Sequence, residues 1–272
     1  MESVTKLLER LQASTDPFEA LIKEKSVYVK TFGSRWSNRI LINEYICLEL
    51  AKALGLTIPD GGLCIINEKT DIENVIDDID YDENITGVGF YSEKIYNVSP
   101  SINSLSVVNN IINKEEINTI ILFDHLVYNV DRHRGNLLLN YKSGLNGFKM
   151  YIIDHSHVFN LQHNWDANGL QKLINNKDYR DHKILDLNYK EVYQYFYELE
   201  ILNENLLRIA ASNFKTIVTE NLLDNIIDNI PKVWIINEAD LLKLKEYILY
   251  RLNNIDYIVE MIIKYEKCLG GV

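Results

Sequence analysis

At 272 residues, with 47% hydrophobic and 25% charged side chains, the chain has the composition of a globular protein and enough length to bury a large core. Its formal net charge of -11 disfavours extended contact with DNA or RNA, because proteins that bind nucleic acids generally present basic surfaces. The sequence has neither a run of about 18 apolar residues nor a basic start followed by an apolar stretch, so we expect no membrane helix and no signal peptide.

The three cysteines, Cys47, Cys64 and Cys268, are odd in number and lack the spacing of metal ligands. We interpret Cys47 and Cys64 as small core residues and Cys268 as a thiol near the end of the chain. This pattern suits a reducing compartment, so we expect a cytoplasmic protein.

The first part of the chain predicts short elements around one long helix. Residues 5–12 have the spacing of a short amphipathic helix, and residues 26–32, rich in β-branched and aromatic side chains, predict a strand. A helix is expected at residues 38–54, because apolar side chains recur every three or four positions and Gly55 follows. Residues 63–66 predict a second strand.

Residues 68–83 are strongly acidic. We expect a solvated loop or an exposed helix face there, and a surface that contacts a partner protein is the alternative. Residues 87–92 begin with Gly-Val-Gly and predict a loop.

The second half of the chain predicts one β-hairpin among helices. A helix at residues 115–127 precedes strands at 137–141 and 148–153, which a turn with two glycines at 143–147 joins. Beyond residue 160 the pattern is mostly helical. The expected helices lie at residues 187–199, 204–214, 219–229 and 238–267.

Polar residues gather on both sides of this hairpin. The run Asn-Val-Asp-Arg-His-Arg-Gly-Asn at residues 129–136 enters the first strand, and Asp154 follows the second. In an antiparallel hairpin those two ends are neighbours, so Asn136 and Asp154 should lie close together. An amide oxygen and a carboxylate are ligands that suit Mg²⁺, and Asp131 is then placed to accept a hydroxyl proton.

Phosphoryl transfer also needs a cation that holds the nucleotide phosphates and a partner that fixes it. Lys30, on the predicted strand at 26–32, and Glu44, on the following helix, fit these two roles. Taken singly, such residues are more often solvated surface groups. The prediction rests on five residues that occur in the right order on the right kinds of element.

Four further residues flank the predicted catalytic position. His133 is expected to help to orient Asp131 or to hydrogen-bond a backbone or phosphate group. Arg132 and Arg134 add positive charge to an acidic protein, so we expect at least one, in the first place Arg132, to meet a phosphate. Asp124 is expected to support Arg132 or His133.

Residues 129–136 together with Ile-Asp-His-Ser-His-Val-Phe at 153–159 resemble the HipA-like kinases and, more distantly, the phosphoinositide 3/4-kinases. Residues 28–32 and 42–59 resemble the amino-terminal lobe of the HipA-like group. There a Val-Lys strand is followed by an Asn-Glu helix that ends in Leu-Gly-x-x-Val-Pro. The resemblance covers residues 26–159.

This resemblance implies an α+β, two-lobed protein-kinase-like fold, with residues 1–90 as the small lobe and 91–272 as the mostly helical lobe. It implies an ATP- and Mg²⁺-dependent serine/threonine protein kinase. Lys30 would contact the phosphates and Glu44 would pair with it. Asp131 would be the catalytic base, and Asn136 and Asp154 the metal ligands.

The sequence departs from the family at the phosphate loop: none of the 29 residues before Lys30 is glycine, so no glycine-rich phosphate loop is expected. In many kinases a glycine follows the metal-binding Asp, and the corresponding residue here is Ser156. The phosphates would be clamped otherwise, or with help from Gly33 and Ser34. Two alternatives therefore stay open: a pseudokinase or nucleotide-binding module of a toxin–antitoxin or phage-defence system, and a small-molecule or lipid kinase. The expected partners are ATP and a protein substrate, and a further partner protein stays open.

Overall fold

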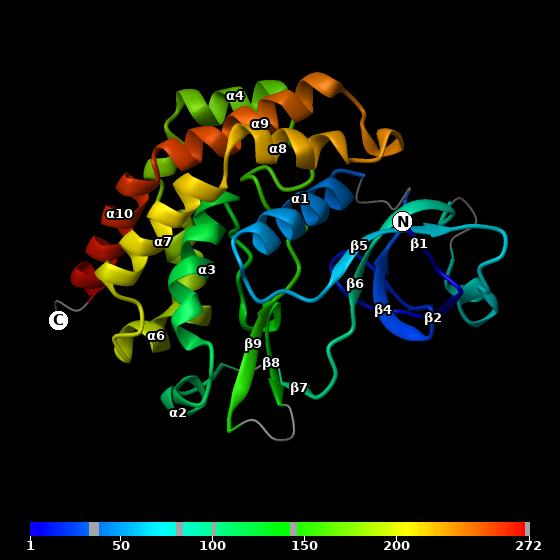
Figure 1. Ribbon diagram of the computed structural model, residues 1–272, viewed down its shortest axis with the longest axis horizontal. Coiled ribbons are helices and arrows are strands. Elements are labelled where there is room, and N and C mark those ends of the chain that lie inside the picture. The colour runs from blue at the N-terminus through cyan, green and yellow to red at the C-terminus, as the bar shows by residue number, and fades with distance from the viewer. Residues whose placement is uncertain (33–37, 80–83, 100–101, 142–145, 270–272) are drawn as a thin grey trace.

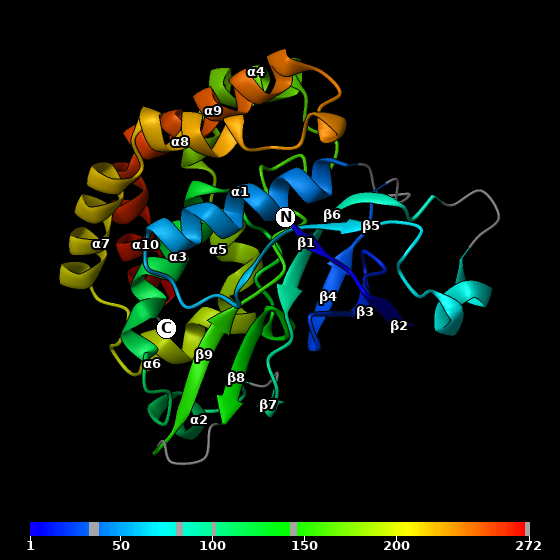
Figure 2. The same cartoon turned by 45° about the vertical axis from the view of Figure 1, so that its right-hand side comes forward.

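A curled six-stranded sheet forms one side of the computed structural model, and helices form most of the other side (Figure 1). The structure describes residues 1–32, 38–79, 84–99, 102–141 and 146–269, with side chains up to Tyr265. The expected α+β class is confirmed. In both views helix α1 (Arg39–Ala53) lies between the sheet and the remaining helices (Figure 2).

The strands of the large sheet lie in the order β1-β5-β6-β4-β3-β2. Only the pairing of β1 with β5 is parallel. A small apolar core fills the inside of this curled sheet, with Leu7, Phe18 and Val29 fully buried. The bounds are β1 Glu2–Ser3, β2 Lys6–Arg10, β3 Phe18–Ile22, β4 Lys25–Lys30, β5 Gly61–Ile66 and β6 Gly87–Glu93.

The helix predicted at residues 5–12 is wrong, because this segment contains strand β2. Leu7 pairs with Ala20 of β3 and is completely buried, whereas Glu9 is exposed. An apolar run of this length fits a period of two residues as well as one of 3.6, so the spacing alone did not decide between strand and helix.

The loop predicted at residues 87–92 is also wrong. These residues form β6, which lies between β5 and β4. The reason for its glycines is close packing: a Cβ atom on Gly89 would lie 2.6 Å from the carbonyl oxygen of Lys30. Gly89 thus allows β4 to lie where it places Lys30.

Most predicted helices are confirmed, but the segment at 238–267 is two helices that meet at Asn254. No helix among the described residues is long and apolar enough to cross a bilayer. The helices after α1 are α2 Leu105–Asn109, α3 Ile117–Leu126, α4 Ala167–Asn175, α5 Lys183–Asn188, α6 Gln194–Glu198, α7 Glu204–Ile217, α8 Glu220–Asp228, α9 Glu238–Asn253 and α10 Ile255–Leu269.

The described part of the acidic stretch at residues 68–83 contains a short 3₁₀ turn, Glu73–Asp78, on which only Val75 is buried. The expected exposed helical face is therefore confirmed as far as residue 79, and contact with a partner stays a prediction. Cys47 and Cys64 are buried and unpaired, as predicted, and the side chain of Cys268 lies outside the described residues.

Helix α1 belongs by its packing to the larger of two apolar cores, together with α3 and the C-terminal helices. Eleven of its fifteen residues are buried, so it is covered on nearly every side rather than on one face. The two cores do not separate at a single point of the chain, and a lobe boundary at residue 90 stays a prediction.

The tight approach at Gly89 leads to a first prediction. Gly89→Ala should lower the free energy of unfolding by about 1–3 kcal/mol, because the added methyl group must displace the backbone of Lys30. Urea denaturation would measure the change, with Ser92→Ala on the same strand as the control. If both variants unfold like the wild type, the packing of β6 against β4 is looser than described.

Candidate active site

The β8–β9 hairpin brings the two predicted metal ligands to the same end of one small sheet. Leu137, the first residue of β8 (Leu137–Tyr141), pairs with Ile152, the last residue of β9 (Phe148–Ile152). One residue further out, the amide of Ile153 donates a hydrogen bond of 3.1 Å to the carbonyl of Asn136. The predicted hairpin is confirmed, although residues 142–145 of its turn lie outside the described residues.

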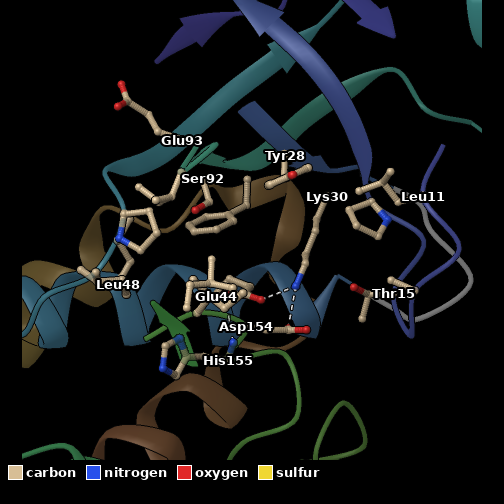
Figure 3. Close-up of a pocket in the computed structure, with 18 of the residues that line it drawn as sticks. Leu11, Thr15, Tyr28, Lys30, Glu44, Leu48, Ser92, Glu93, Asp154 and His155 are labelled. Carbon is tan, nitrogen blue, oxygen red and sulfur yellow. Dashed lines mark hydrogen bonds and ion pairs between the residues drawn. The ribbon is translucent and has the colours of Figure 1, made fainter. Parts of the chain in front are cut away.

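Lys30 lies at the centre of the site (Figure 3). Its ammonium group pairs with Glu44 and lies 2.9 Å from Oδ1 of Asp154. The hydroxyl of Ser156 accepts a third hydrogen bond from the same ammonium group, at 2.6 Å. Strand β4, helix α1 and the segment after β9 therefore meet at one cation.

The surroundings change the ionisation of all three charged groups. Burial alone would lower the pKa of Lys30, but the carboxylates of Asp154 and Glu44 outweigh it, and the pKa is raised. Burial would raise the pKa of Asp154, but Lys30 holds it well below the usual range. The pKa of Glu44 is raised, since burial and the neighbouring Asp154 charge outweigh the attraction of Lys30.

Asp154 adopts a left-handed backbone conformation, with φ of 55°. A non-glycine residue rarely does so, and the conformation costs about 1–3 kcal/mol unless neighbouring contacts hold it. Oδ1 of Asp154 accepts a hydrogen bond of 2.8 Å from the Ser156 hydroxyl as well as the one from Lys30. These contacts hold the carboxylate against the strain of its own backbone.

Asp131 lies in a short loop that its neighbours brace. The side chain of Asn129 accepts from the amide of Asp131 at 2.9 Å, and Nδ2 of Asn136 donates to the Asp131 carbonyl at 2.8 Å. Because Nδ2 of Asn136 is used in this way, its Oδ1 is the atom left for a metal. His133 is exposed, and its Nδ1 accepts from the amide of Gly135 at 3.0 Å.

Arg132 links the two segments that carry the predicted metal ligands. Its guanidinium, completely buried, pairs with Asp124 at 2.9 Å, which confirms the expected support from that residue. It also donates to the carbonyls of Asn136 at 2.8 Å and Ile153 at 3.1 Å. Nη2 lies 3.0 Å from Nε2 of His155, which must accept, because a guanidinium only donates.

These contacts bear on the expectation that Arg132 meets a phosphate. Its guanidinium is turned into the protein and surrounded by protein acceptors, which is the position of a structural link rather than of a phosphate ligand. Burial, followed by the charge of Arg132, holds the pKa of His155 well below its ordinary value, so the imidazole is neutral. The neighbouring Arg134 is partly exposed and bonds the carbonyl of Glu191.

A cavity of about 300 Å³ opens above Lys30 and Asp154. One part is polar, lined by Lys30, Glu44 and Asp154, and the rest is mostly apolar. The apolar lining includes Tyr28, Ile58, Phe90, Ile95, Leu138 and Ile153.

Sequence reasoning missed one wall of this cavity, the β2–β3 loop (residues 11–17). Leu11, Ala13, Thr15 and Pro17 all line the cavity. The signal that could have found the loop is its sequence, Ala-Ser-Thr-Asp-Pro, which is rich in turn-forming residues. The wrong assignment of a helix at residues 5–12 hid it.

Comparison with known proteins identifies the family of the chain. A profile of the family described as HipA-like kinase matches residues 4–257. The proinflammatory kinase CtkA of Helicobacter pylori is similar in structure, with 17% identity and a TM-score of 0.56 over 96% of this chain and 98% of that chain. HipA of Shewanella oneidensis MR-1, solved with HipB and operator DNA, gives 12% identity and a TM-score of 0.48 over 93% of this chain and 65% of that chain. No curated protein matches the chain.

The buried position of Arg132 leads to a second prediction. Arg132→Met should lower the free energy of unfolding by about 3–5 kcal/mol, because it leaves Asp124 buried without its partner. Arg134→Met, at a partly exposed neighbour, should change it by less than about 0.5 kcal/mol. Chemical denaturation measures both values. A stable Arg132→Met variant with weakened nucleotide binding would instead support a phosphate contact.

Proposed function

Because the chain belongs to the family of HipA-like kinases, we propose that it transfers the γ-phosphoryl group of ATP to a serine or threonine hydroxyl of a protein. The observation that carries the proposal is the meeting of Lys30, Glu44 and Asp154 at the polar end of the cavity. A buried lysine fixed by two carboxylates beside an open cavity is the arrangement that phosphate positioning requires.

The two parts of the cavity suit the two parts of a nucleotide. Tyr28, Phe90 and Ile153 belong to the apolar part, which fits a flat base. The phosphates would then extend toward Lys30, whose raised pKa keeps its ammonium charged at neutral pH.

The donor set fits Mg²⁺. Asn136 offers an amide oxygen and Asp154 a carboxylate that is ionised at neutral pH, at adjacent ends of the hairpin. Mg²⁺ is usually held by one or two such protein groups together with phosphate oxygens and water. When bound there, the metal would neutralise charge on the phosphates.

Asp131 is the proposed general base. Its backbone is fixed by Asn129 and Asn136, so the base and one metal ligand have a set separation. The carboxylate would accept or orient the proton of the acceptor hydroxyl. His133, exposed beside it, is proposed to orient Asp131 or the acceptor.

One observation favours a second function, a nucleotide-binding module without turnover. The β2–β3 loop contains no glycine, although a glycine-rich loop usually covers the phosphates in protein kinases. The same charged groups would then hold Mg-ATP for recognition by a partner. A small-molecule or lipid acceptor is the remaining alternative.

A third prediction tests the base. Asp131→Asn should lower phosphoryl transfer by about 100-fold or more, because a positioned base contributes roughly that much, while ATP affinity stays within about twofold. The assay incubates the purified protein, alone and with cell lysate, with radiolabelled γ-ATP and Mg²⁺. Asp77→Asn, on the exposed acidic stretch, is the control.

The possible results of this assay separate the candidates. Transfer by Asp131→Asn at the wild-type rate would refute its role as base. Wild-type protein that binds ATP but labels nothing would favour the binding module. Labelling of a small molecule or lipid, with no labelled protein, would change the acceptor class.

A fourth prediction tests the metal ligand. Asp154→Asn should abolish the part of ATP binding that depends on Mg²⁺, because the remaining amide is a weaker ligand and no longer attracts the cation. The measurement is the shift in thermal unfolding caused by ATP with Mg²⁺ and with EDTA. In the wild type, ATP at 100 times its Kd should stabilise by about 2.7 kcal/mol. Equal shifts with Mg²⁺ and EDTA in the wild type would contradict a metal site.

A further inference from the structure

The β2–β3 loop (residues 11–17) forms one wall of the cavity and contains no glycine. It joins two antiparallel strands, as a phosphate-covering hairpin must, and alternate residues of it line the cavity. Two of these lining residues, Leu11 and Pro17, are joined by a hydrogen bond of 2.9 Å between their backbones.

Thr15 is the polar side chain that this loop directs into the cavity. It is only 5% exposed, and its hydroxyl has no hydrogen-bond partner among the described residues. In the view of Figure 3 the Thr15 hydroxyl points toward the side on which Lys30 and Asp154 are drawn, and all three residues line the cavity. Because Thr15 lines the cavity, its hydroxyl can donate a hydrogen bond to a group that arrives with a ligand.

Contacts within the loop and with neighbouring segments fix the backbone around Thr15. The amide of Asp16 donates to the carbonyl of Ala13 at 3.1 Å, and Asp16 takes a left-handed conformation with φ of 46°. Arg10 lies 4.0 Å from the Asp16 carboxylate and also donates to the carbonyl of Asp78 at 2.6 Å. These contacts constrain the backbone of the loop on both sides of Thr15.

We propose that the Thr15 hydroxyl donates a hydrogen bond to a non-bridging phosphate oxygen of the bound nucleotide. A side-chain donor thereby takes the part for which other kinases use the amides of a glycine-rich loop. This inference rests on the proposed function, because it needs a nucleotide whose phosphates lie beside Lys30.

The test compares ATP with adenosine, which lacks phosphates. Thr15→Val removes the hydroxyl and keeps the shape, whereas Thr15→Ser keeps the hydroxyl. Isothermal titration calorimetry with Mg²⁺ should show ATP binding about 10-fold or more weaker in Thr15→Val, since a hydrogen bond to a charged group contributes roughly that factor. Adenosine affinity should stay unchanged, and Thr15→Ser should bind ATP like the wild type.

Two controls separate a contact from a disturbed loop. Ser14→Ala removes the neighbouring hydroxyl, which is exposed, and should leave ATP binding unchanged. Thermal unfolding checks that each variant folds, and Thr15→Ala replaces Thr15→Val if the valine is not tolerated.

The results of these titrations distinguish failure of the Thr15 contact from failure of the proposed function. Wild-type ATP affinity in Thr15→Val, or in Thr15→Ala where that variant replaces it, would overturn the Thr15 contact and leave the proposed function intact. Equal losses for ATP and adenosine would also overturn it, because they indicate a distorted cavity. If the wild-type protein binds neither ligand, the proposed function itself fails, and that result appears before any variant is tested.

Discussion

The whole site depends on the ammonium group of Lys30, which lies between the carboxylates of Glu44 and Asp154. One positive charge faces two acidic groups: Lys30 holds the pKa of Asp154 below its usual range, whereas burial, together with the Asp154 charge, raises the pKa of Glu44. The cluster therefore has one more acidic group than basic groups beside the cavity. The divalent cation proposed to bind Asp154 would offset that excess negative charge.

The position of Glu44 is fixed by its neighbours on both sides. Asn43, the preceding residue of α1, donates to the Ser156 carbonyl at 2.7 Å and accepts from the indole of Trp165 at 2.9 Å. The Ser156 hydroxyl lies 2.8 Å from Glu44 itself. Two adjacent helix residues, Asn43 and Glu44, thus hold the segment that carries Asp154, so the partner of Lys30 and the proposed metal ligand are positioned together. Polar groups that are buried and fully bonded in this way specify a single arrangement.

The sequence was sufficient to predict elements and contacts where the local apolar pattern and the chemistry of the side chains agreed. The hairpin that joins Asn136 to Asp154 followed from two apolar runs and a glycine-containing turn, and the Lys30–Glu44 contact from a strand followed by a helix. It was insufficient where an element is formed by contacts with residues that are distant in the sequence. Gly89 belongs to a strand because Lys30 lies against it, and Trp234 donates to the carbonyl of Val88 across 146 positions. No local window contains either partner, so composition suggested a loop.

The burial of Arg132 costs hydration free energy, but its guanidinium makes contacts that an apolar side chain could not make. Burying its pair with Asp124 loses hydration that the attraction between the charges only partly offsets, and apolar residues of similar volume would often be as stable. What apolar residues could not do is donate to the carbonyls of Asn136 and Ile153 at the same time. Asp131 and Asn136 are five positions apart and are set by their own loop, whereas Asp154 is 18 positions beyond Asn136. Together with the pairing of the hairpin, the guanidinium holds that second separation, so we infer that its main contribution is to the geometry of the proposed metal ligands.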